Sequence, residues 1–356
     1  MKPLRFVICG AGFWARYQLA AWRELPGAVC VAVSDPVAER AEALAAAFGI
    51  PAVYTDAEAM LERERPDFVD IIAAPVAHRA LVELAVRRGV PVICQKPLAE
   101  TPEDARAMLA ACEAAGVPLL VHENWRWQPP LRALAQVLRS GEIGEPFRAR
   151  VDFITSFPVF DNQPFLATLP RFIIADVGVH LLDVARFLFG EASTLYAQTQ
   201  RVNPAIQGED VATVMTRHGG CTVVTNMSYA SRTEHERFPE TFAFIEGRAG
   251  SAGLTPGGEL RVTTRAGGTR VQPCPLPVLA WADPDYAVVH AGMLACQKNL
   301  LAALRGEGRA ETTGADNLRT LDLVFAAYES AATGRAIAFD ERAAREIPHT
   351  LSTQHA

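Results

Sequence analysis

"LRFVICGAGFWARYQLAAW", residues 4–22, determines the fold that the following segments continue. It reads as a buried strand, a glycine turn and a helix with apolar residues at helical spacing. Two glycines match the start of G-x-G-x-x-G/A, and Ala15 takes the third place, where a small residue lets helix and strand pack closely. Backbone N–H groups of such a turn can approach a pyrophosphate. The predicted dinucleotide contacts are Gly10, Ala11, Gly12, Phe13 and Trp14.

A second apolar strand, "VCVAVSDP" at residues 29–36, ends in a carboxylate. Asp35 stands where this unit places the acid that bonds the adenosine ribose hydroxyls. The alternative makes Asp35 a turn residue or helix cap before Pro36. A carboxylate here would repel a ribose 2′-phosphate, which favours NAD over NADP. Arg40, one turn into the next helix, is a second candidate contact on this side of the cofactor.

Strands and helices continue to alternate up to about residue 124, which indicates βαβ units and a parallel sheet. Ligands of such sheets bind at the carboxyl ends of the strands. Two strand ends, "AAPVAH" and "CQKP", should therefore meet in one crevice. The lysine of the second, Lys96, follows a buried apolar strand, and its charge needs a partner or a function there. The residues expected there are Ala74, Pro75, His78, Gln95 and Lys96, with His78 equally readable as a helix cap or surface histidine.

The pattern changes in the second part of the chain, where strands follow one another with few helices from about Phe147. Runs of strands suggest one large, mostly antiparallel sheet. We predict an α/β dinucleotide-binding Rossmann domain at residues 1–124 and an α+β domain for substrate binding and oligomerisation at residues 125–356. A large sheet with one uncovered face would expose more apolar area than a soluble monomer tolerates, so a homodimer or homotetramer is expected.

The stretch "ADVGVHLLDVARFLFGE", residues 175–191, predicts a helix with Asp176 and His180 on one face. Such a carboxylate and imidazole suit acid–base catalysis. The structural alternative makes Asp176 an N-cap, pairs Asp183 with Arg186 and leaves His180 in the core, with Gly190 ending the helix.

Two aromatic-rich stretches offer candidate substrate contacts. Trp125 and Trp127 flank Arg126 at the predicted domain junction, a composition that suits stacking on a sugar or nicotinamide but equally suits a packing corner. In the first interpretation the two tryptophans contact the substrate and Arg126 contacts the cofactor. Asp161 and Asn162 lie in "FPVFDNQPF", which is typical of a polyhydroxy-compound site and of a plain turn alike.

Composition excludes several classes of protein. A net charge of -6 without basic blocks disfavours nucleic acid. The seven cysteines are scattered singly and form no CxxC pair, which argues against disulfides and zinc and favours a reducing cytoplasm. The histidines show no ligand spacing, so we predict no metal. No uninterrupted apolar stretch reaches the about 18 residues typical of a membrane span.

Together the motifs resemble the Gfo/Idh/MocA family of NAD(P)-dependent sugar and polyol oxidoreductases. The resemblance rests on "GAGFWA", "APVAH", "QKP" and "DVGVHLLDVARFLFGE", in family order. "VICQKP", "VHENWRWQ" and "FPVFDNQPF" further resemble the family's D-apiose dehydrogenase branch. Gln95 departs from the family's usual glutamate, and "FIIA" before Asp176 replaces a glycine-rich approach.

The resemblance implies an NAD-dependent dehydrogenase that oxidises an aldose or polyol hydroxyl, with D-apiose to its lactone as one case. His180 would take the hydroxyl proton, Asp176 would orient the imidazole, and Lys96 would bond the reacting oxygen. Activity should then rise with pH through an apparent pKa near or above that of free histidine. A redox-neutral NAD-dependent glycosidase and a non-catalytic dinucleotide sensor are the alternatives.

Overall fold

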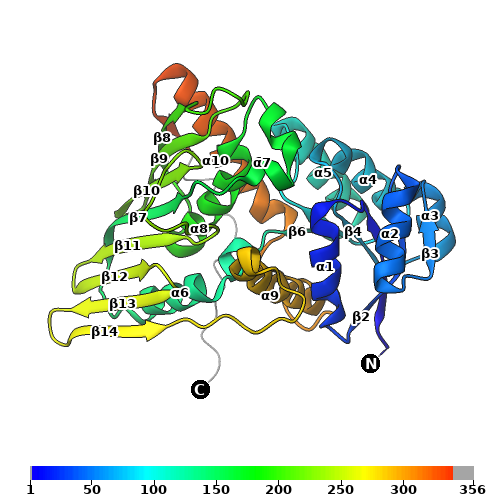
Figure 1. Ribbon diagram of the computed structural model, residues 1–356, viewed down its shortest axis with the longest axis horizontal. Coiled ribbons are helices and arrows are strands. Elements are labelled where there is room, and N and C mark those ends of the chain that lie inside the picture. The colour runs from blue at the N-terminus through cyan, green and yellow to red at the C-terminus, as the bar shows by residue number, and fades with distance from the viewer. Residues whose placement is uncertain (1, 340–356) are drawn as a thin grey trace.

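The strand predicted first is β1 (Leu4–Cys9), and in the computed structural model, which describes residues 2–339, it lies inside a six-stranded parallel sheet (Figure 1). The sheet order is β3-β2-β1-β4-β5-β6. The other strands are β2 (Ala28–Ser34), β3 (Ala52–Tyr54), β4 (Phe68–Ile71), β5 (Val92–Gln95) and β6 (Leu119–His122). The alternating helices are α1 (Phe13–Arg23), α2 (Ala38–Phe48), α3 (Ala57–Glu64), α4 (Pro75–Arg87) and α5 (Pro102–Ala115). The predicted Rossmann-type unit is confirmed.

The strand order reverses between β1 and β4, which is where open parallel sheets bind ligands. The glycine turn after β1, the loop after β4 and the loop after β5 therefore open on one edge. β3 and α3 were not anticipated from the sequence, because β3 is only three residues long and only partly buried.

The second domain is built on a nine-stranded sheet of order β14-β13-β12-β11-β7-β10-β9-β8-β15, in which only the β7–β10 pair is parallel. Its strands are β7 (Pro146–Ile154), β8 (Thr194–Gln200), β9 (Val211–His218), β10 (Cys221–Ser228), β11 (Phe242–Gly247), β12 (Gly250–Thr255), β13 (Glu259–Thr264), β14 (Gly268–Pro273) and β15 (Ile337–Ala338). The large, mostly antiparallel sheet is thus confirmed.

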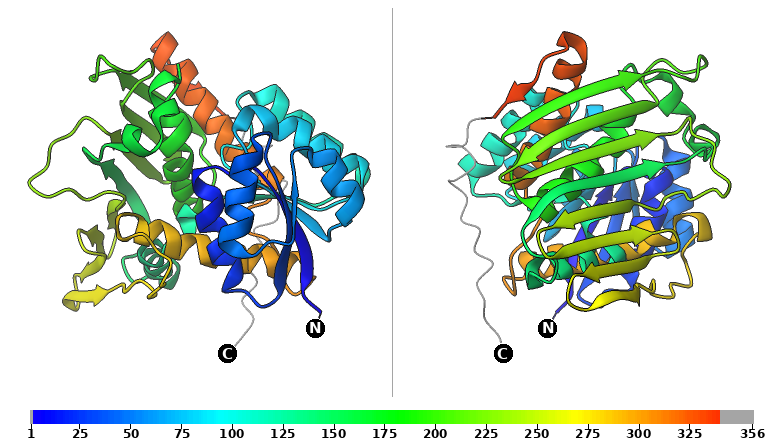
Figure 2. Two further views of the ribbon diagram at one scale, coloured as in Figure 1. Left: turned by 45° about the vertical axis from the view of Figure 1, so that its right-hand side comes forward. Right: turned by 90° about the vertical axis from the view of Figure 1, so that its left-hand side faces the viewer.

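Helices cover one face of this sheet and lie between it and the first domain, whereas the described residues leave the other face open (Figure 2). The longer ones are α6 (Pro129–Ser140), α8 (Val179–Phe189), α9 (Ala287–Leu304) and α10 (Gly314–Thr333). The short ones are η1 (Trp125–Trp127), α7 (Val159–Asn162), η2 (Pro164–Thr168), η3 (Ile174–Gly178) and η4 (Pro284–Tyr286).

Helices from late in the chain return to the first domain. α9 packs against α1, and α10 packs against α5 and β6. One apolar cluster contains Val7 and Val92 from the first sheet together with Val151 from the second and Leu321 from α10. This shared core fixes the two strand layers relative to each other, which gives the crevice between them a defined shape. The linear division at residue 124 stays a prediction.

Two further differences from the sequence reading concern helices. The helix expected over residues 175–191 begins as a π-helical turn, η3, before α8 continues it, and Gly190 ends it as predicted. By length and composition Pro284–Leu304 qualifies as a candidate membrane span, which the search for uninterrupted apolar runs did not anticipate. It is weak support for a membrane, because 56% of that apolar window is buried inside the protein, as in a core helix.

Candidate active site

A single cavity of about 1320 Å³ runs along the edge where the strand order reverses and continues toward the second sheet. Most of the predicted site residues line it. They are Gly10, Ala11, Gly12, Phe13, Trp14, Asp35, Arg40, Ala74, Pro75, Gln95, Lys96, Trp125, Asn162, Asp176 and His180. Residues from seven separate segments of the chain therefore meet in this cavity.

The glycine turn fits the pyrophosphate of a dinucleotide. Gly10 has φ of 102°, and a Cβ there would lie 2.6 Å from the Ile72 carbonyl oxygen, so only glycine is tolerated. A Cβ on Gly12 would meet nothing within 4 Å, which leaves room beside the start of α1. No side chain caps α1 or α4, in contrast to α5 and its Thr101 cap. The N–H groups at the start of α1 therefore remain available to an anion, whereas α4 begins with Pro75, which has no N–H.

Asp35 serves the glycine turn as well as the cavity. Its carboxylate accepts hydrogen bonds from the Ala11 N–H (2.8 Å) and the Val37 N–H (2.9 Å). The turn role weighed against ribose binding is therefore present, and it holds the carboxylate at the cavity wall with lone pairs to spare. Ribose binding by Asp35 stays a prediction.

Lys96 finds its partner across the domain boundary. Its Nζ donates to the Asp176 carboxylate (3.0 Å) and to the Asp176 carbonyl oxygen (2.9 Å). The two side chains are 14% and 22% exposed, so the pair is open to a ligand in the cavity rather than sealed. This contact answers why an ammonium can follow the buried strand β5.

Behind Lys96 a chain of amides reaches into the core of the first domain. The Gln95 side chain accepts from the Lys96 N–H and donates to Gln18, which donates to the Asp70 carboxylate. Burial raises the pKa of Asp70 to about 7. The amide of Gln95 can donate to Gln18, which an ionised glutamate could not do, and this gives the departure from the family's glutamate a physical reason.

His180 is oriented by a residue that the sequence reading missed. Its Nδ1 lies 2.7 Å from Oε1 of Glu123, which follows β6, and not against Asp176 as predicted. The prediction failed because it treated residues 176–180 as a regular α-helix, whereas η3 is a π-helical turn and Asp176 faces Lys96. Burial, with the nearby Lys96 charge, lowers the pKa of His180 well below its usual value.

Trp125 reaches the cavity but uses its ring differently from the prediction. It stacks on the His180 imidazole, with ring centroids 4.4 Å apart and planes at 23°. Its indole N–H donates to Thr241 and its backbone N–H donates to Glu123. Trp125 therefore holds the plane of the imidazole, and stacking of this ring on a sugar is not supported.

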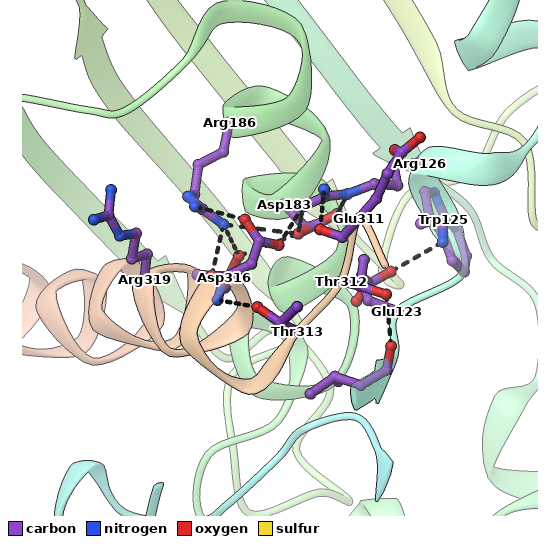
Figure 3. Close-up of polar contacts among 12 residues, drawn as sticks. Glu123, Trp125, Arg126, Asp183, Arg186, Glu311, Thr312, Thr313, Asp316 and Arg319 are labelled. Atoms are coloured by element: carbon purple, nitrogen blue, oxygen red, sulfur yellow. Dashed lines mark hydrogen bonds and ion pairs between the residues drawn. The ribbon is translucent and has the colours of Figure 1, made fainter. Parts of the chain in front are cut away.

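Arg126 is corrected as a cofactor contact, because its guanidinium is committed elsewhere. It donates to Asp183 (2.7 Å) and Asp316 (2.9 Å) and does not line the cavity. Arg186 approaches the same acidic pair from the other side (Figure 3). Asp183 thus pairs mainly with Arg126, whereas its closest contact with Arg186 is 4.0 Å.

Three more predicted contacts lie outside the cavity lining and are corrected. His78 is fully buried, with both ring nitrogens against the carbonyl oxygens of Leu98 and Ala73, so it packs helix α4 against the strand ends. Trp127 lies under the Arg132 guanidinium, 3.7 Å from its ring centroid. Asp161 is exposed at the surface of α7.

The far wall of the cavity comes from residues without a sequence signal. Tyr229, Phe238 and Tyr286 line it beside the amides of Asn162 and Gln163. Phe238 and Tyr286 contact edge to face, with centroids 5.2 Å apart. They lie on loops and a 3₁₀ turn that no short motif marks, and only their aromatic character in the second domain hinted at a ligand wall.

Fold and site together define a two-domain, pyridine-nucleotide-dependent oxidoreductase. A Rossmann sheet carries a glycine turn before a helix without a side-chain cap, and a lysine, an aspartate and a histidine line the same cavity. The chain belongs to the Gfo/Idh/MocA family. Residues 4–123 match its model described as an oxidoreductase family with an NAD-binding Rossmann fold, and residues 131–252 match the GFO/IDH/MocA C-terminal domain. NAD is thus the cofactor of the first domain, as predicted.

Similar proteins extend over nearly the whole chain. A D-apiose dehydrogenase of Paraburkholderia graminis is 48% identical over 99% of this chain and 94% of the relative. One of Rhizobium rhizogenes is 45% identical over 95% and 98%. An oxidoreductase from Agrobacterium radiobacter, crystallised with NAD+, L-tartaric acid and magnesium, is 44% identical with a TM-score of 0.93, covering 95% of this chain and 98% of its own. The resemblance to the D-apiose dehydrogenase branch is confirmed.

Proposed function

We propose that the protein oxidises an aldose or polyol hydroxyl with NAD, and that it converts D-apiose to its lactone. The observation that carries the proposal is the convergence of Lys96, Asp176 and His180 on one cavity wall that also contains the glycine turn. The identity of 48% and 45% to two D-apiose dehydrogenases supports D-apiose as the sugar.

The residues of this chain divide the chemistry between them. Among the described residues the His180 ring makes a hydrogen bond through Nδ1 alone, so Nε2 is left to accept the hydroxyl proton. Lys96 can donate to the same oxygen and stabilise the negative charge that develops on it. Asp176 holds the ammonium in place. NAD, when bound, supplies the hydride acceptor.

The test follows NADH absorbance when the protein is mixed with NAD and a panel of D-apiose, D-xylose and myo-inositol, together with product analysis for the lactone. NADH and lactone in equal amounts from D-apiose support the proposal. No NADH from any of the three contradicts it. Cleavage of a glycoside without net NADH would instead favour the redox-neutral glycosidase.

Self-association is the proposed use of the open sheet face. Met215, Phe244 and Val271 are 45–47% exposed, and paired register places Met215 and Phe244 on either side of Val224 and Arg150. The same row also contains Arg150 and Arg261, so apolar and charged side chains alternate across this face. Exposed large apolar side chains on an uncovered sheet are typical of an interface between copies. Sedimentation should show a dimer or larger species at micromolar concentration, and Phe244→Glu should shift it toward monomer.

A reducing cytoplasm is the proposed compartment. All seven cysteines are free, and most are buried. Burial raises the pKa of the Cys9 thiol to about 12, which keeps it unreactive.

Among residues 2–339 no group of three or more His, Cys, Asp or Glu side chains is placed to hold a metal ion.

A further inference from the structure

Glu123 is held in an unusual setting for a carboxylate. Its side chain is fully buried and does not line the cavity. Oε1 accepts from the Trp125 N–H (2.9 Å) and contacts His180 Nδ1 (2.7 Å), whereas Oε2 is buried without a hydrogen-bond partner among the described residues. An ionised carboxylate left half-satisfied in the interior is costly unless a nearby group compensates its charge.

The charged and titratable groups around the pair are already engaged or distant. The groups acting on Glu123 are Lys96, Arg126, Asp183, Asp316 and Cys296, and those acting on His180 are Lys96, Asp176, Asp183 and His122. Lys96 donates to Asp176, and Arg126 donates to Asp183 and Asp316. Among residues 2–339, the imidazole of His180 is therefore the one titratable side chain in hydrogen-bond contact with the Glu123 carboxylate that can compensate its charge.

We propose that Glu123 and His180 form a proton-sharing pair, in which Glu123 is the positioning residue that makes His180 Nε2 the base. The inference rests on the proposed dehydrogenase function and deepens it. Glu123 fixes the tautomer with hydrogen on Nδ1, which exposes the Nε2 lone pair to the cavity. The stacked Trp125 ring holds the imidazole plane in that orientation.

The proton released from the substrate hydroxyl is accounted for within this pair. During oxidation the substrate O–H bond breaks and an N–H bond forms at Nε2, while the electron pair of the C–H bond leaves as hydride to NAD. The imidazole then has hydrogen on both nitrogens beside an ionised Glu123, or passes the Nδ1 hydrogen to Oε1. Either arrangement leaves the pair neutral, so no uncompensated charge is created in the interior.

This sharing sets the pH at which the base is available. Burial raises the pKa of Glu123 to about 7, and burial with the Lys96 charge lowers the pKa of His180 well below its usual value. The proton that blocks Nε2 is therefore taken up by the pair near pH 7 and not by His180 alone. Oxidation should rise with pH through about 7 in the wild type. Without the carboxylate, this rise in activity, the acidic limb of the pH profile, should move below the ordinary histidine pKa of about 6.5.

The experiment compares the pH dependence of kcat in wild type, Glu123→Gln and Asp322→Asn. Asp322 on α10 contacts Arg106 and not His180, so it controls for the carboxylate-to-amide change. Glu123→Gln should lower kcat roughly 10- to 1000-fold, because a weaker and less ordered base remains. The rise of kcat with pH should shift to lower pH. KM should stay within about threefold, because Glu123 does not line the cavity. Asp322→Asn should keep the wild-type limb.

A second measurement needs no turnover. Imidazole ¹⁵N signals of the histidine-labelled protein, with His180 identified from its absence in His180→Gln, should titrate near pH 7 in the wild type and below 6.5 in Glu123→Gln. The absence of any change in the wild-type His180 signals near pH 7, where the pair should take up its proton, overturns the pairing even if Glu123→Gln fails to fold. Unchanged titration or an unchanged limb in Glu123→Gln also overturns it. Inactive wild type with the expected titration would contradict the proposed substrate and leave the pair standing.

Discussion

Helix α8 carries two buried polar centres three residues apart, and they are satisfied to different degrees. Around Asp183 each charge has a partner: Arg126 binds Asp183 and Asp316, and Arg186 binds Asp316 from the other side (Figure 3). Arg186 also binds Glu191. Around His180, Nε2 and the Glu123 Oε2 atom are left without protein partners among the described residues. A fully paired network specifies packing, whereas an incompletely paired one reserves atoms for a ligand or a proton.

The largest expected effect separates the two centres through His180→Ala. Turnover should fall roughly hundred- to ten-thousand-fold, which corresponds to about 2.7–5.4 kcal/mol in the barrier, because the positioned base is lost. NAD affinity, measured by tryptophan fluorescence, should stay unchanged. His235→Ala at an exposed histidine is the matched control. Near-wild-type turnover in His180→Ala would remove the base from the mechanism.

The complementary change is Arg186→Met in the paired network. Its side chain is 4% exposed and binds Asp316, Glu191 and Thr320, so its loss leaves buried carboxylates under-compensated. The free energy of unfolding should drop by about 3–5 kcal/mol, measured by denaturant titration. Turnover per folded molecule should be largely retained. Arg148→Met, at an exposed ion pair, should change neither quantity. Loss of turnover without loss of stability would show that the two centres are not separable in this way.

Lys96→Met tests the half-open pair that faces the same cavity. It keeps the apolar stem and removes the ammonium, so turnover should fall roughly hundred- to thousand-fold, as for a lost donor to a developing oxyanion. Cofactor affinity should change too, because Lys96 comes from the dinucleotide domain at the end of β5. The exposed Lys298→Met is the control. A Lys96→Met enzyme with normal kcat would show that charge on the reacting oxygen is stabilised elsewhere.

Sequence reasoning located the first domain's half of the site well, because strand ends and glycine turns are local features that the parallel sheet brings together by rule. It located Lys96, Asp176 and His180 but mispaired them. The partner of His180 follows a strand 57 residues earlier in the chain, and the π-helical turn at η3 breaks the i, i+4 geometry on which the pairing relied.

Other errors have a similar origin in tertiary context. Arg126 and His78 have the polarity of ligand contacts, but burial turned both toward protein partners. Strand β12 was not anticipated because four of the six residues in its sequence, GSAGLT, are glycine, serine or alanine, which do not favour strands. Gly250 there is required because a Cβ would lie 2.2 Å from the Thr263 carbonyl oxygen of the neighbouring strand. No local pattern reveals such a close approach.

The smallest expected effect concerns Asp35 and Arg40, which line the cavity beside the glycine turn and which we expect to act on the cofactor's ribose in opposite senses. Asp35 is 7% exposed and fixed by two backbone N–H groups, whereas Arg40 is exposed. Solvent screens the arginine more than the aspartate, so repulsion of a 2′-phosphate should win over attraction. Two unit charges about 4 Å apart interact by roughly 1–4 kcal/mol between water and a protein surface, which is enough for a tenfold preference.

NAD should therefore bind at least tenfold more tightly than NADP when both are titrated against tryptophan fluorescence. Asp35→Asn removes the charge and should bring the two affinities within about threefold, mainly by tightening NADP. Arg40→Ala, the control at the exposed position, should change the ratio less. Equal affinities in the wild type would mean that Asp35 acts only as the clamp between Ala11 and Val37, the turn role that its hydrogen bonds already display. If the ratio of NAD to NADP affinity changes more in Arg40→Ala than in Asp35→Asn, Arg40 has the larger influence on the cofactor's ribose. Repulsion by Asp35 would then not be the reason for a preference for NAD.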